Sequence, residues 1–459
     1  MRTMKKEKIM KKFIIAIITV TLLTSCTEDF LNNPPTTGLS TDKLIDLPAM
    51  EALIYGAYGQ VRSFVHQPVL YGTALSRDVL IRERAEYDQF YDHLLTTSMT
   101  GWMFSQGYSS LGTLNTVSES DLENMNGTDE EKNAILGDKH FLRAYIYFNL
   151  NNYFALPSTG YSVPLLLEPL GVNDSAECAS TAAVIERIEE DIELARNYFS
   201  EVSGEADYYA ATALAARIYF FHEKYDLAYE RANEVIESGK FELETNPADA
   251  FVPGASSKEI LFTIKYNASD GSGTSPSLRM FEAYRPEQSQ GFYSLNPDSE
   301  VAALWSADTA DLRYKSFFTE TPQLTYIDGK YTTDQMDFIV IRLAEVYLTR
   351  AEAAIMNNNS VSQADVDDMN MIIGRGNPGN VLTGIPALQD ALDLLYEERL
   401  KELAFETDDH YLNVRRLKKP IIQSPTEGGG WKNYEEYSDL LVFPFPETEV
   451  GFHNLTRNP

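Results

Sequence analysis

Apolar residues between positions 341 and 354 cover more than one face of the helix that their spacing predicts. Two stripes run along it: Leu343, Val346, Tyr347 and Ala351 on one side, and Ile341, Ala344, Leu348, Ala351 and Ile355 on the other. The polar residues left over are Arg342, Glu345, Thr349 and Glu352. Such a helix must be covered on two sides, and its alanines let neighbouring helices approach closely. The pattern therefore predicts a central helix in a stack of helices.

Helical patterns recur in pairs elsewhere in the chain. In residues 211–241 a helix containing Leu214 and Ile218 is followed by a turn at 222–224 and a second helix that ends before Gly239. Two short antiparallel helices joined by a tight turn resemble a tetratricopeptide unit of about 34 residues. Residues 341–375 predict another such pair, and so do the helices at 129–156 and 181–199. The expected fold is mainly α, a tetratricopeptide-like scaffold with inserted irregular loops and short strands.

Local signals place several helix ends. A helix is expected to begin near 46–48, where Pro48 suits a first helical position, and another at Thr128, which forms a capping box with Glu131. Between them, Trp102, Tyr108, Leu111 and Asn115 show a rough helical spacing. This spacing predicts that Trp102 lies in the core.

The pattern changes between residues 242 and 338. One run at 259–266 predicts a strand, a Gly/Ser-rich loop follows, and residues 280–305 are dense in Tyr, Phe, Pro and Asn. Irregular segments inserted into a rigid helical scaffold are where binding residues concentrate. We therefore expect a ligand-binding insert at about 243–338 within a single domain that spans 46–459.

The N-terminus carries a secretory signal. Lys11 and Lys12 precede a short apolar run at 13–23, which is too short to span a membrane, and residues 23–26 read Leu-Thr-Ser-Cys. This ending matches the bacterial lipobox, in which the cysteine thiol receives a diacylglycerol. The sequence predicts a signal peptide at 1–25, lipidation of Cys26, and a tether at 26–45 that holds the body of the protein at a membrane surface.

Charge and cysteine content narrow the possible partners. The chain has a formal net charge of −30 at pH 7, which argues against nucleic acid and against anionic polymers held by charge alone. With Cys26 acylated, Cys178 has no partner for a disulfide.

Catalytic and cofactor motifs are weak. The sequence contains no HExxH, GxSxG, Walker or CxxC motif, and its six histidines lack the spacing of metal ligands, so neither metal nor cofactor is expected. Gly374, Gly376 and Gly379 form a GxGxxG string, but it follows a helix and contains Pro378, which disfavours phosphate binding. A pair of carboxylates for glycoside hydrolysis stays open, because its members can lie far apart in sequence.

Aromatic residues beside polar side chains suggest a sugar site. Sugars present apolar C–H faces and hydroxyls, so their sites combine flat rings with hydrogen-bonding side chains. Two stretches have this mixture, and the candidate ligand-binding residues are Tyr284, Arg285, Tyr293, Asn296 and Trp305 in one and Arg82, Tyr87 and Tyr91 in the other. Ordinary core packing is the alternative for each aromatic ring.

Phrases along nearly the whole chain resemble the SusD/RagB family of nutrient-binding outer-membrane lipoproteins of Bacteroidetes. They are Cys26 with residues 28–31, Trp102 with Tyr108 and Asn115, residues 141–148, Val163-Pro164, residues 311–313, residues 342–353, residues 398–406, Phe445-Pro446 and Asn458-Pro459. The resemblance implies helix pairs that support a variable ligand-binding face and a surface-exposed, lipid-anchored protein that is not an enzyme. It also implies a partnership with a SusC-like TonB-dependent transporter.

Three functions follow from these observations. The main hypothesis is the capture of an oligosaccharide for the transporter, and the alternatives are capture of a peptide, as in RagB-like members, or a tetratricopeptide adaptor that binds only protein. Oligosaccharide capture requires that Tyr293 or Trp305 lie on an exposed surface, whereas the adaptor requires that both be buried.

Overall fold

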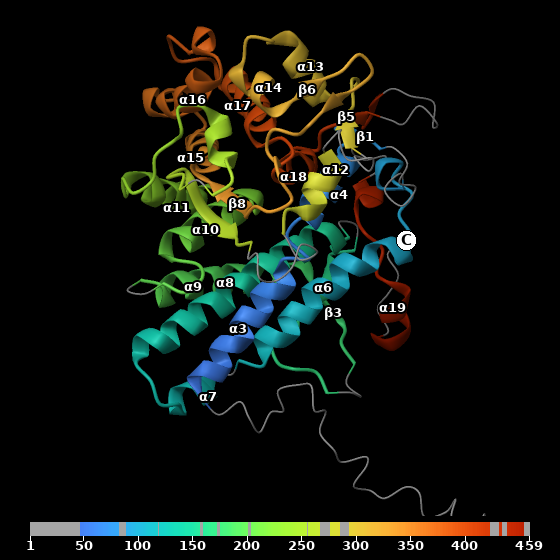
Figure 1. The fold of residues 1–459 in the computed structure, drawn as a ribbon, viewed down its shortest axis with the longest axis vertical. Helices are drawn as coiled ribbons and strands as arrows, with labels where there is room; N and C mark the ends of the chain where they lie inside the picture. The colour runs from blue at the N-terminus through green and yellow to red at the C-terminus, as the bar shows by residue number, and fades with distance from the viewer. Residues whose placement is uncertain are drawn as a thin grey trace, which may run out of the picture.

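The structure is a computed structural model that describes residues 46–81, 89–117, 119–156, 159–171, 175–200, 203–254, 256–266, 276–284, 293–422, 431–433 and 438–453. Over these residues the fold is mainly α, and the strands pair only in twos (Figure 1). The predicted fold class is confirmed. No helix among these residues is both long and apolar enough to cross a membrane.

Three long helices from the N-terminal half lie side by side (Figure 1). They are α3 (Leu47–Val61), α6 (Thr97–Asn115) and α8 (Asp129–Phe154), with the shorter α4 (Gln67–Leu75) and α7 (Glu119–Asn124) between them in sequence. α3 begins where predicted, because the Asp46 side chain accepts a hydrogen bond of 3.0 Å from the Ala49 backbone. The capping box of Thr128 and Glu131 likewise starts α8.

All three predicted helix pairs are present, and the two helices of each pair pack against each other. The pairs are α8 with α9 (Thr181–Tyr198), α10 (Tyr208–Phe221) with α11 (Tyr225–Glu237), and α15 (Leu343–Asn358) with α16 (Gln363–Gly376). Two further helices, α17 (Leu388–Leu403) and α18 (Asp409–Arg416), follow. Gly239 after α11 has φ of +63°, and Asn359 after α15 is also left-handed, which ends both helices.

The central helix begins two residues later than predicted. Residues Phe338–Arg342 form strand β8, which pairs antiparallel with β4 (Ile260–Ile264). All five residues of β8 are buried, and its β-branched and aromatic side chains suit a buried strand better than a helix. From Leu343 onward the prediction holds: α15 packs against α11, α16 and α17, so both of its apolar stripes are covered.

The segment predicted as an insert contains short elements. They are η2 (Pro247–Phe251), β4, α12 (Leu278–Tyr284), β5 (Tyr293–Leu295), α13 (Glu300–Ala307), α14 (Leu312–Phe317), β6 (Thr319–Glu320) and β7 (Thr325–Tyr326). The other strands are β1 (Val79–Ile81), β2 (Tyr161–Pro164), β3 (Cys178–Ser180), β9 (Ile421–Ile422) and β10 (Trp431–Lys432), and the last helix is α19 (Glu447–His453). β2 pairs with β3 and places the Cys178 thiol at a half-buried position.

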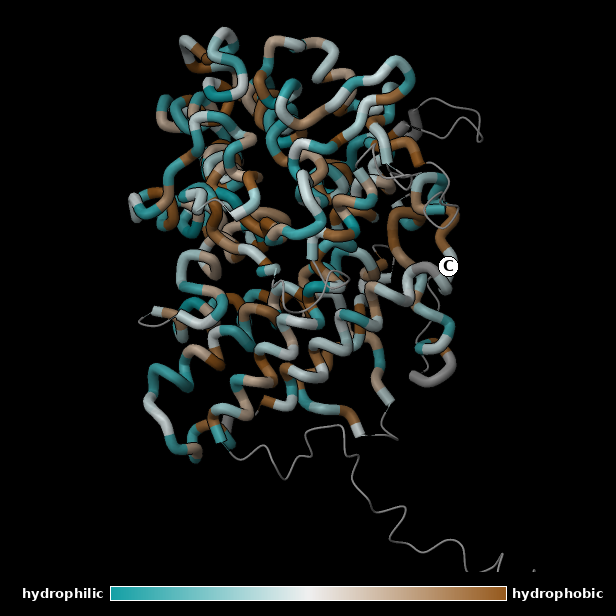
Figure 2. The backbone as a smooth tube through the Cα atoms, viewed as in Figure 1, coloured by the Kyte–Doolittle hydropathy of each residue, from teal (hydrophilic) through white to brown (hydrophobic). Residues whose placement is uncertain are grey.

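The prediction that Trp102 lies in the core is wrong. Its side chain is 56% exposed, whereas Leu111 on the same helix is fully buried. Hydrophobic and hydrophilic residues alternate along the long helices (Figure 2). Trp102 belongs to the exposed side of α6, together with Ser105, Ser109 and Gly112. The six residues from Trp102 to Tyr108 make about 1.7 helical turns, so the two side chains point in different directions.

Candidate ligand-binding site

A two-stranded ribbon brings the two predicted ligand-binding stretches together. β1 and β5 run antiparallel, with Ile81 opposite Tyr293. Ile81 ends β1 and Tyr293 begins β5, so these two residues mark one end of the ribbon. Arg82, Tyr87 and Arg285 belong to residues 82–88 and 285–292, outside the described residues.

Beside the ribbon, Tyr91 and Asn296 meet around Arg77. The Arg77 Nε donates to the Tyr91 carbonyl oxygen at 2.7 Å, and its guanidinium lies 5.4 Å from the centre of the Tyr91 ring. The Asn296 Nδ2 donates to the Arg77 carbonyl oxygen at 2.8 Å and lies 3.5 Å from the Tyr91 hydroxyl. Two of the predicted residues are therefore held together by an arginine that the sequence did not single out.

The backbone on either side of residues 82–91 is strained. Arg77 and His93 have φ of +58° and +55°, a left-handed conformation that costs a non-glycine residue of order 1 kcal/mol or more. His93 Nε2 lies 2.9 Å from the Leu75 carbonyl oxygen, a hydrogen bond that holds the strained turn in place. Strain of this kind concentrates at functional sites. No local sequence motif predicts the left-handed backbone at these two positions, because arginine and histidine residues usually adopt ordinary backbone conformations.

Four of the predicted residues are buried. Tyr284 and Tyr293 are 0% exposed, Trp305 is 1% exposed and Asn296 is 2% exposed. Neither Tyr293 nor Trp305 meets the exposure required above for oligosaccharide capture, and the burial of both is what the adaptor alternative required. The Tyr293 hydroxyl donates to the Leu70 carbonyl oxygen at 3.0 Å, and the Trp305 ring packs against Tyr314 and Phe318. Core packing accounts for these rings. Tyr91 is the one described candidate with a half-buried side chain.

A partly buried histidine, His410 on α18, links the residue before β1 to Glu300 on α13 and to the Tyr396 hydroxyl on α17, which lies 3.1 Å from its Nε2. His410 Nδ1 lies 2.7 Å from Asp78 Oδ2, and its Nε2 lies 3.7 Å from Glu300 Oε2. Burial alone would lower the pKa of His410, but the carboxylates of Asp78 and Glu300 outweigh it and raise this pKa to about 10. Both ring nitrogens therefore carry protons at neutral pH, and the imidazolium ties α18 to the residue that precedes β1.

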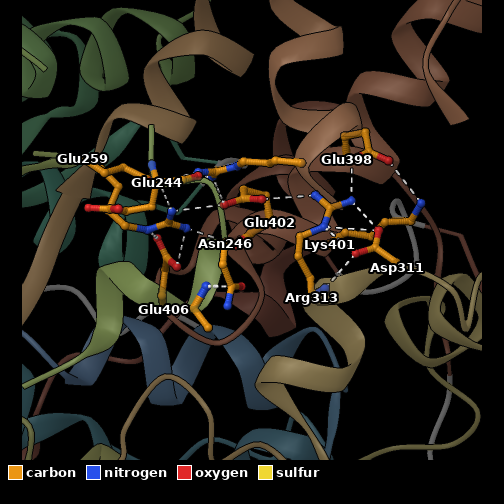
Figure 3. A network of polar contacts seen from close by, with 12 residues as sticks. Glu244, Asn246, Glu259, Asp311, Arg313, Glu398, Lys401, Glu402 and Glu406 are labelled. Atoms are coloured by element: carbon orange, nitrogen blue, oxygen red, sulfur yellow. Dashed lines mark hydrogen bonds and ion pairs between the residues drawn. The ribbon is translucent and has the colours of Figure 1, made fainter. Parts of the chain in front are cut away.

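Charged side chains from β4, β8, α14, α16 and α17 and from the residues next to them meet in a buried cluster (Figure 3). We call it the charged cluster, and its members are Glu259, Asp311, Arg313, Lys330, Arg342, Arg375, Glu398, Lys401, Glu402 and Glu406. Glu402 stands at its centre and bonds to the guanidiniums of Arg313, Arg342 and Arg375. Five basic and five acidic side chains thus compensate one another.

The cluster sets the ionisation of its members. Burial would raise the pKa of Glu402, but the guanidiniums of Arg375, Arg342 and Arg313 outweigh it and hold this pKa well below its usual range. Burial lowers the pKa of Lys330 to about 8, although Glu406 opposes the shift. A Cβ atom on Gly376 would lie 2.7 Å from the guanidinium of Arg313. Gly376 in the GxGxxG string therefore makes room for an arginine.

The described residues contain no group of His, Cys, Asp or Glu that could hold a metal ion. Beside the ribbon, the described residues present the half-buried Tyr91 ring next to Arg77 and Asn296.

Comparisons with known proteins agree with this architecture. Residues 260–441 match the family model described as the SusD family, and residues 29–220 match the model described as starch-binding associating with outer membrane. A search of curated proteins finds no match. The solved structure of a SusD superfamily protein from Bacteroides thetaiotaomicron VPI-5482 is similar, with a TM-score of 0.76, 20% identity, and coverage of 90% of this chain and 100% of that chain.

Two further solved structures are similar at comparable levels. A putative sugar binding protein from Bacteroides vulgatus ATCC 8482 has a TM-score of 0.76 at 20% identity and covers 90% of this chain and 98% of that chain. A laminarin binding SusD-like protein has a TM-score of 0.72 at 18% identity and covers 90% of this chain and 99% of that chain.

Proposed function

Because the chain belongs to the SusD/RagB family, we propose that it is a cell-surface lipoprotein that binds oligosaccharides and delivers them to a SusC-like TonB-dependent transporter in the outer membrane. The observation that carries the proposal is the match of two family models to the two halves of the chain, one of them described as starch-binding and associating with the outer membrane. The names of two similar structures, a sugar binding and a laminarin binding protein, support the same ligand class.

The proposed primary site lies along the β1–β5 ribbon. Tyr91 is half-buried beside Arg77 and Asn296, which flank the Val79–Leu295 end of the ribbon. Arg82, Tyr87 and Arg285 belong to the sequence segments that continue from its Ile81–Tyr293 end. We assign ligand contact to these four residues. Tyr284, Tyr293, Asn296 and Trp305 are not assigned ligand contact, because their side chains are buried.

Calorimetry on the soluble form, residues 27–459, tests the proposal. Titration with laminarihexaose, maltohexaose, cellohexaose and xylohexaose is expected to give heat of binding for at least one oligosaccharide. A Tyr91→Ala variant is expected to bind it at least tenfold more weakly, while Tyr229→Ala, which removes an aromatic side chain 39% exposed on α11, leaves the Kd unchanged. Heat with peptides and none with any sugar would favour the peptide-capturing alternative.

Binding without cleavage is part of the proposal. Chromatography of the bound oligosaccharide after prolonged incubation is expected to recover it intact. Shortened products, absent from a heat-denatured control, would contradict a binding-only function.

Membrane attachment is proposed to depend on Cys26, which lies outside the described residues. Mass spectrometry of the N-terminal peptide is expected to find a diacylated Cys26. A Cys26→Ala protein is expected to leave the membrane fraction, and its retention there would contradict the lipid anchor. Co-purification of the anchored protein with a TonB-dependent transporter tests delivery.

A further inference from the structure

A cleft of about 500 Å³ lies along α6, apart from the β1–β5 ribbon. Its walls come from α6, from the segment after β2, and from Glu449 in α19, and it shares no lining residue with the ribbon region. In Figure 1, α6 and α19 lie well away from β1 and β5. The lining residues are Phe104, Ser105, Tyr108, Ser109, Gly112, Asn115, Pro164, Leu166, Glu168, Pro169, Leu170, Ala176 and Glu449. A volume of this size falls in the range of clefts that bind small ligands.

One stripe of α6 is open toward solvent and contains the exposed tryptophan. Trp102, Ser105, Ser109 and Gly112 follow one another at spacings of three and four residues, and all four are exposed. Ser105, Ser109 and Gly112 line the cleft, and Trp102 lies one turn before Ser105 on the same side. The Trp102 ring, 56% exposed, therefore stands beside the cleft.

The polar lining of the cleft accepts hydrogen bonds. Asn115 is only 6% exposed; its Nδ2 donates to the Leu166 carbonyl oxygen at 2.9 Å, while its Oδ1 has no hydrogen-bond partner within the described chain. The Tyr108 hydroxyl donates to the Pro164 carbonyl oxygen at 2.5 Å, and its ring packs against Phe104 with 4.4 Å between the ring centres. The described lining residues include the carboxylates of Glu168 and Glu449, and none of them is a lysine, arginine or histidine.

An unsatisfied buried acceptor costs free energy that a ligand donor would recover. The ligand must therefore bring donors, present an apolar face to Leu166, Pro169 and Leu170, and carry no negative charge close to Glu168. A neutral hexopyranose meets all three conditions, because its hydroxyls donate and its C–H faces are apolar. Sulfated sugars and uronic acids fail the third condition by like-charge repulsion.

We propose that this cleft is a second glycan subsite, in which a neutral pyranose ring donates hydrogen bonds to Asn115 Oδ1 and Glu168 and the next ring of the oligosaccharide stacks on Trp102. The inference rests on the proposed function, since it takes the same class of ligand. It adds a site and a selectivity for uncharged sugars that the ribbon region does not supply.

Gly112 lines the cleft, so a larger side chain at this position can be used to block it. A Cβ on Gly112 would meet no atom within 4 Å, so Gly112→Leu places a side chain into the cleft without disturbing α6. Gly59 on α3 is matched: it is exposed, helical, and has no atom within 4 Å of its Cβ. With the best neutral oligosaccharide of the panel, calorimetry is expected to give a Kd at least tenfold weaker for Gly112→Leu and unchanged for Gly59→Leu. Equal affinities in both variants would overturn the subsite.

A spectroscopic readout separates contact from indirect effects. In protein labelled with 5-fluorotryptophan, the Trp102 resonance is identified by its loss in Trp102→Phe, and the oligosaccharide is expected to shift it while the resonance of buried Trp305 stays in place. A bound oligosaccharide that leaves the Trp102 resonance unmoved would overturn the stacking. If the wild type binds no sugar at all, the proposed function itself fails. If it binds and Gly112→Leu binds equally well, only the subsite fails.

Discussion

The charged cluster and the α6 cleft differ in whether their buried polar atoms have hydrogen-bond partners. In the cluster, Glu402 is 0% exposed and bonds to three guanidiniums. In the cleft, the Oδ1 of Asn115 is buried without a partner and Trp102 is exposed. Residues from both regions contribute to the family resemblance. Buried charges that are all paired stabilise one structure, whereas a buried acceptor without a partner, beside an exposed ring, is available to a ligand.

The largest effect on this comparison is expected from a substitution that removes the charge of Glu402, at the centre of the cluster. Glu402→Gln keeps the shape of the side chain but leaves Arg313, Arg342 and Arg375 with one fewer negative charge at a site that excludes water. We expect a loss of about 3–5 kcal/mol in the free energy of unfolding, measured by urea denaturation. Glu397→Gln, on the same helix but outside the cluster, is expected to change it by about 0.5 kcal/mol or less.

Affinity should not follow stability in this experiment. Folded Glu402→Gln protein is expected to bind the oligosaccharide with the Kd of the wild type, because the cluster contributes no exposed side chain to either proposed site. A Kd that weakened tenfold in protein shown to be folded by circular dichroism would contradict the separation of the two regions.

A smaller loss is expected at Gly376. Gly376→Ala would place a Cβ atom 2.7 Å from the Arg313 guanidinium, so Arg313 must shift from Asp311 and Glu398. Overpacking of this kind costs about 1–3 kcal/mol. Gly384→Ala is the control, since its Cβ would meet no atom within 4 Å. Equal stability of the two variants would mean that Arg313 relocates freely.

The helical scaffold could be predicted from the sequence because its signals are local. The capping box at Thr128 and the two apolar stripes of α15 depend on residues within a few turns of one another. The cluster itself could not be predicted, although several of its residues belong to the motifs of the family resemblance. Its members come from distant parts of the chain: Arg342 and Glu402, for example, are 60 positions apart. Arg342 and Glu345, named above only as polar residues left over beside the two apolar stripes, are both buried.

The binding residues were harder to predict, for physical reasons. An aromatic ring looks the same in a sequence whether it fills a core or faces solvent. Tyr293 and Trp305, for which both ligand contact and core packing were open, are buried, and Trp102, predicted to lie in the core, is exposed. The helical spacing of α6 could have predicted an exposed Trp102, because Trp102 lies on the same stripe as two serines and a glycine. The left-handed backbone at Arg77 and His93 has no comparable signal.

The imidazolium of His410 predicts how stability depends on pH. Its pKa is about 10 in the folded protein, above the ordinary value of about 6.5, so the stabilisation is complete below pH about 6.5 and is lost as pH rises toward 10. We expect wild-type protein to lose roughly 2 kcal/mol more than His410→Gln between pH 7 and pH 8.5, measured as urea midpoints at each pH. Asp78→Asn is expected to flatten the same slope. Parallel slopes for all three proteins would show that His410 is neutral.

The smallest expected effect on stability is at Trp102, and it bears most directly on the contrast. Because its side chain is 56% exposed, Trp102→Ala removes little buried area and is expected to change the free energy of unfolding by about 0.5 kcal/mol or less. Tyr161→Ala, at 59% exposure, is the matched control and should behave alike. Only Trp102→Ala is expected to weaken oligosaccharide binding, because Trp102 shares the exposed stripe of α6 with Ser105, Ser109 and Gly112, which line the cleft. A large loss of stability in Trp102→Ala would instead make the ring part of the scaffold, and the two regions would then differ only in their charge.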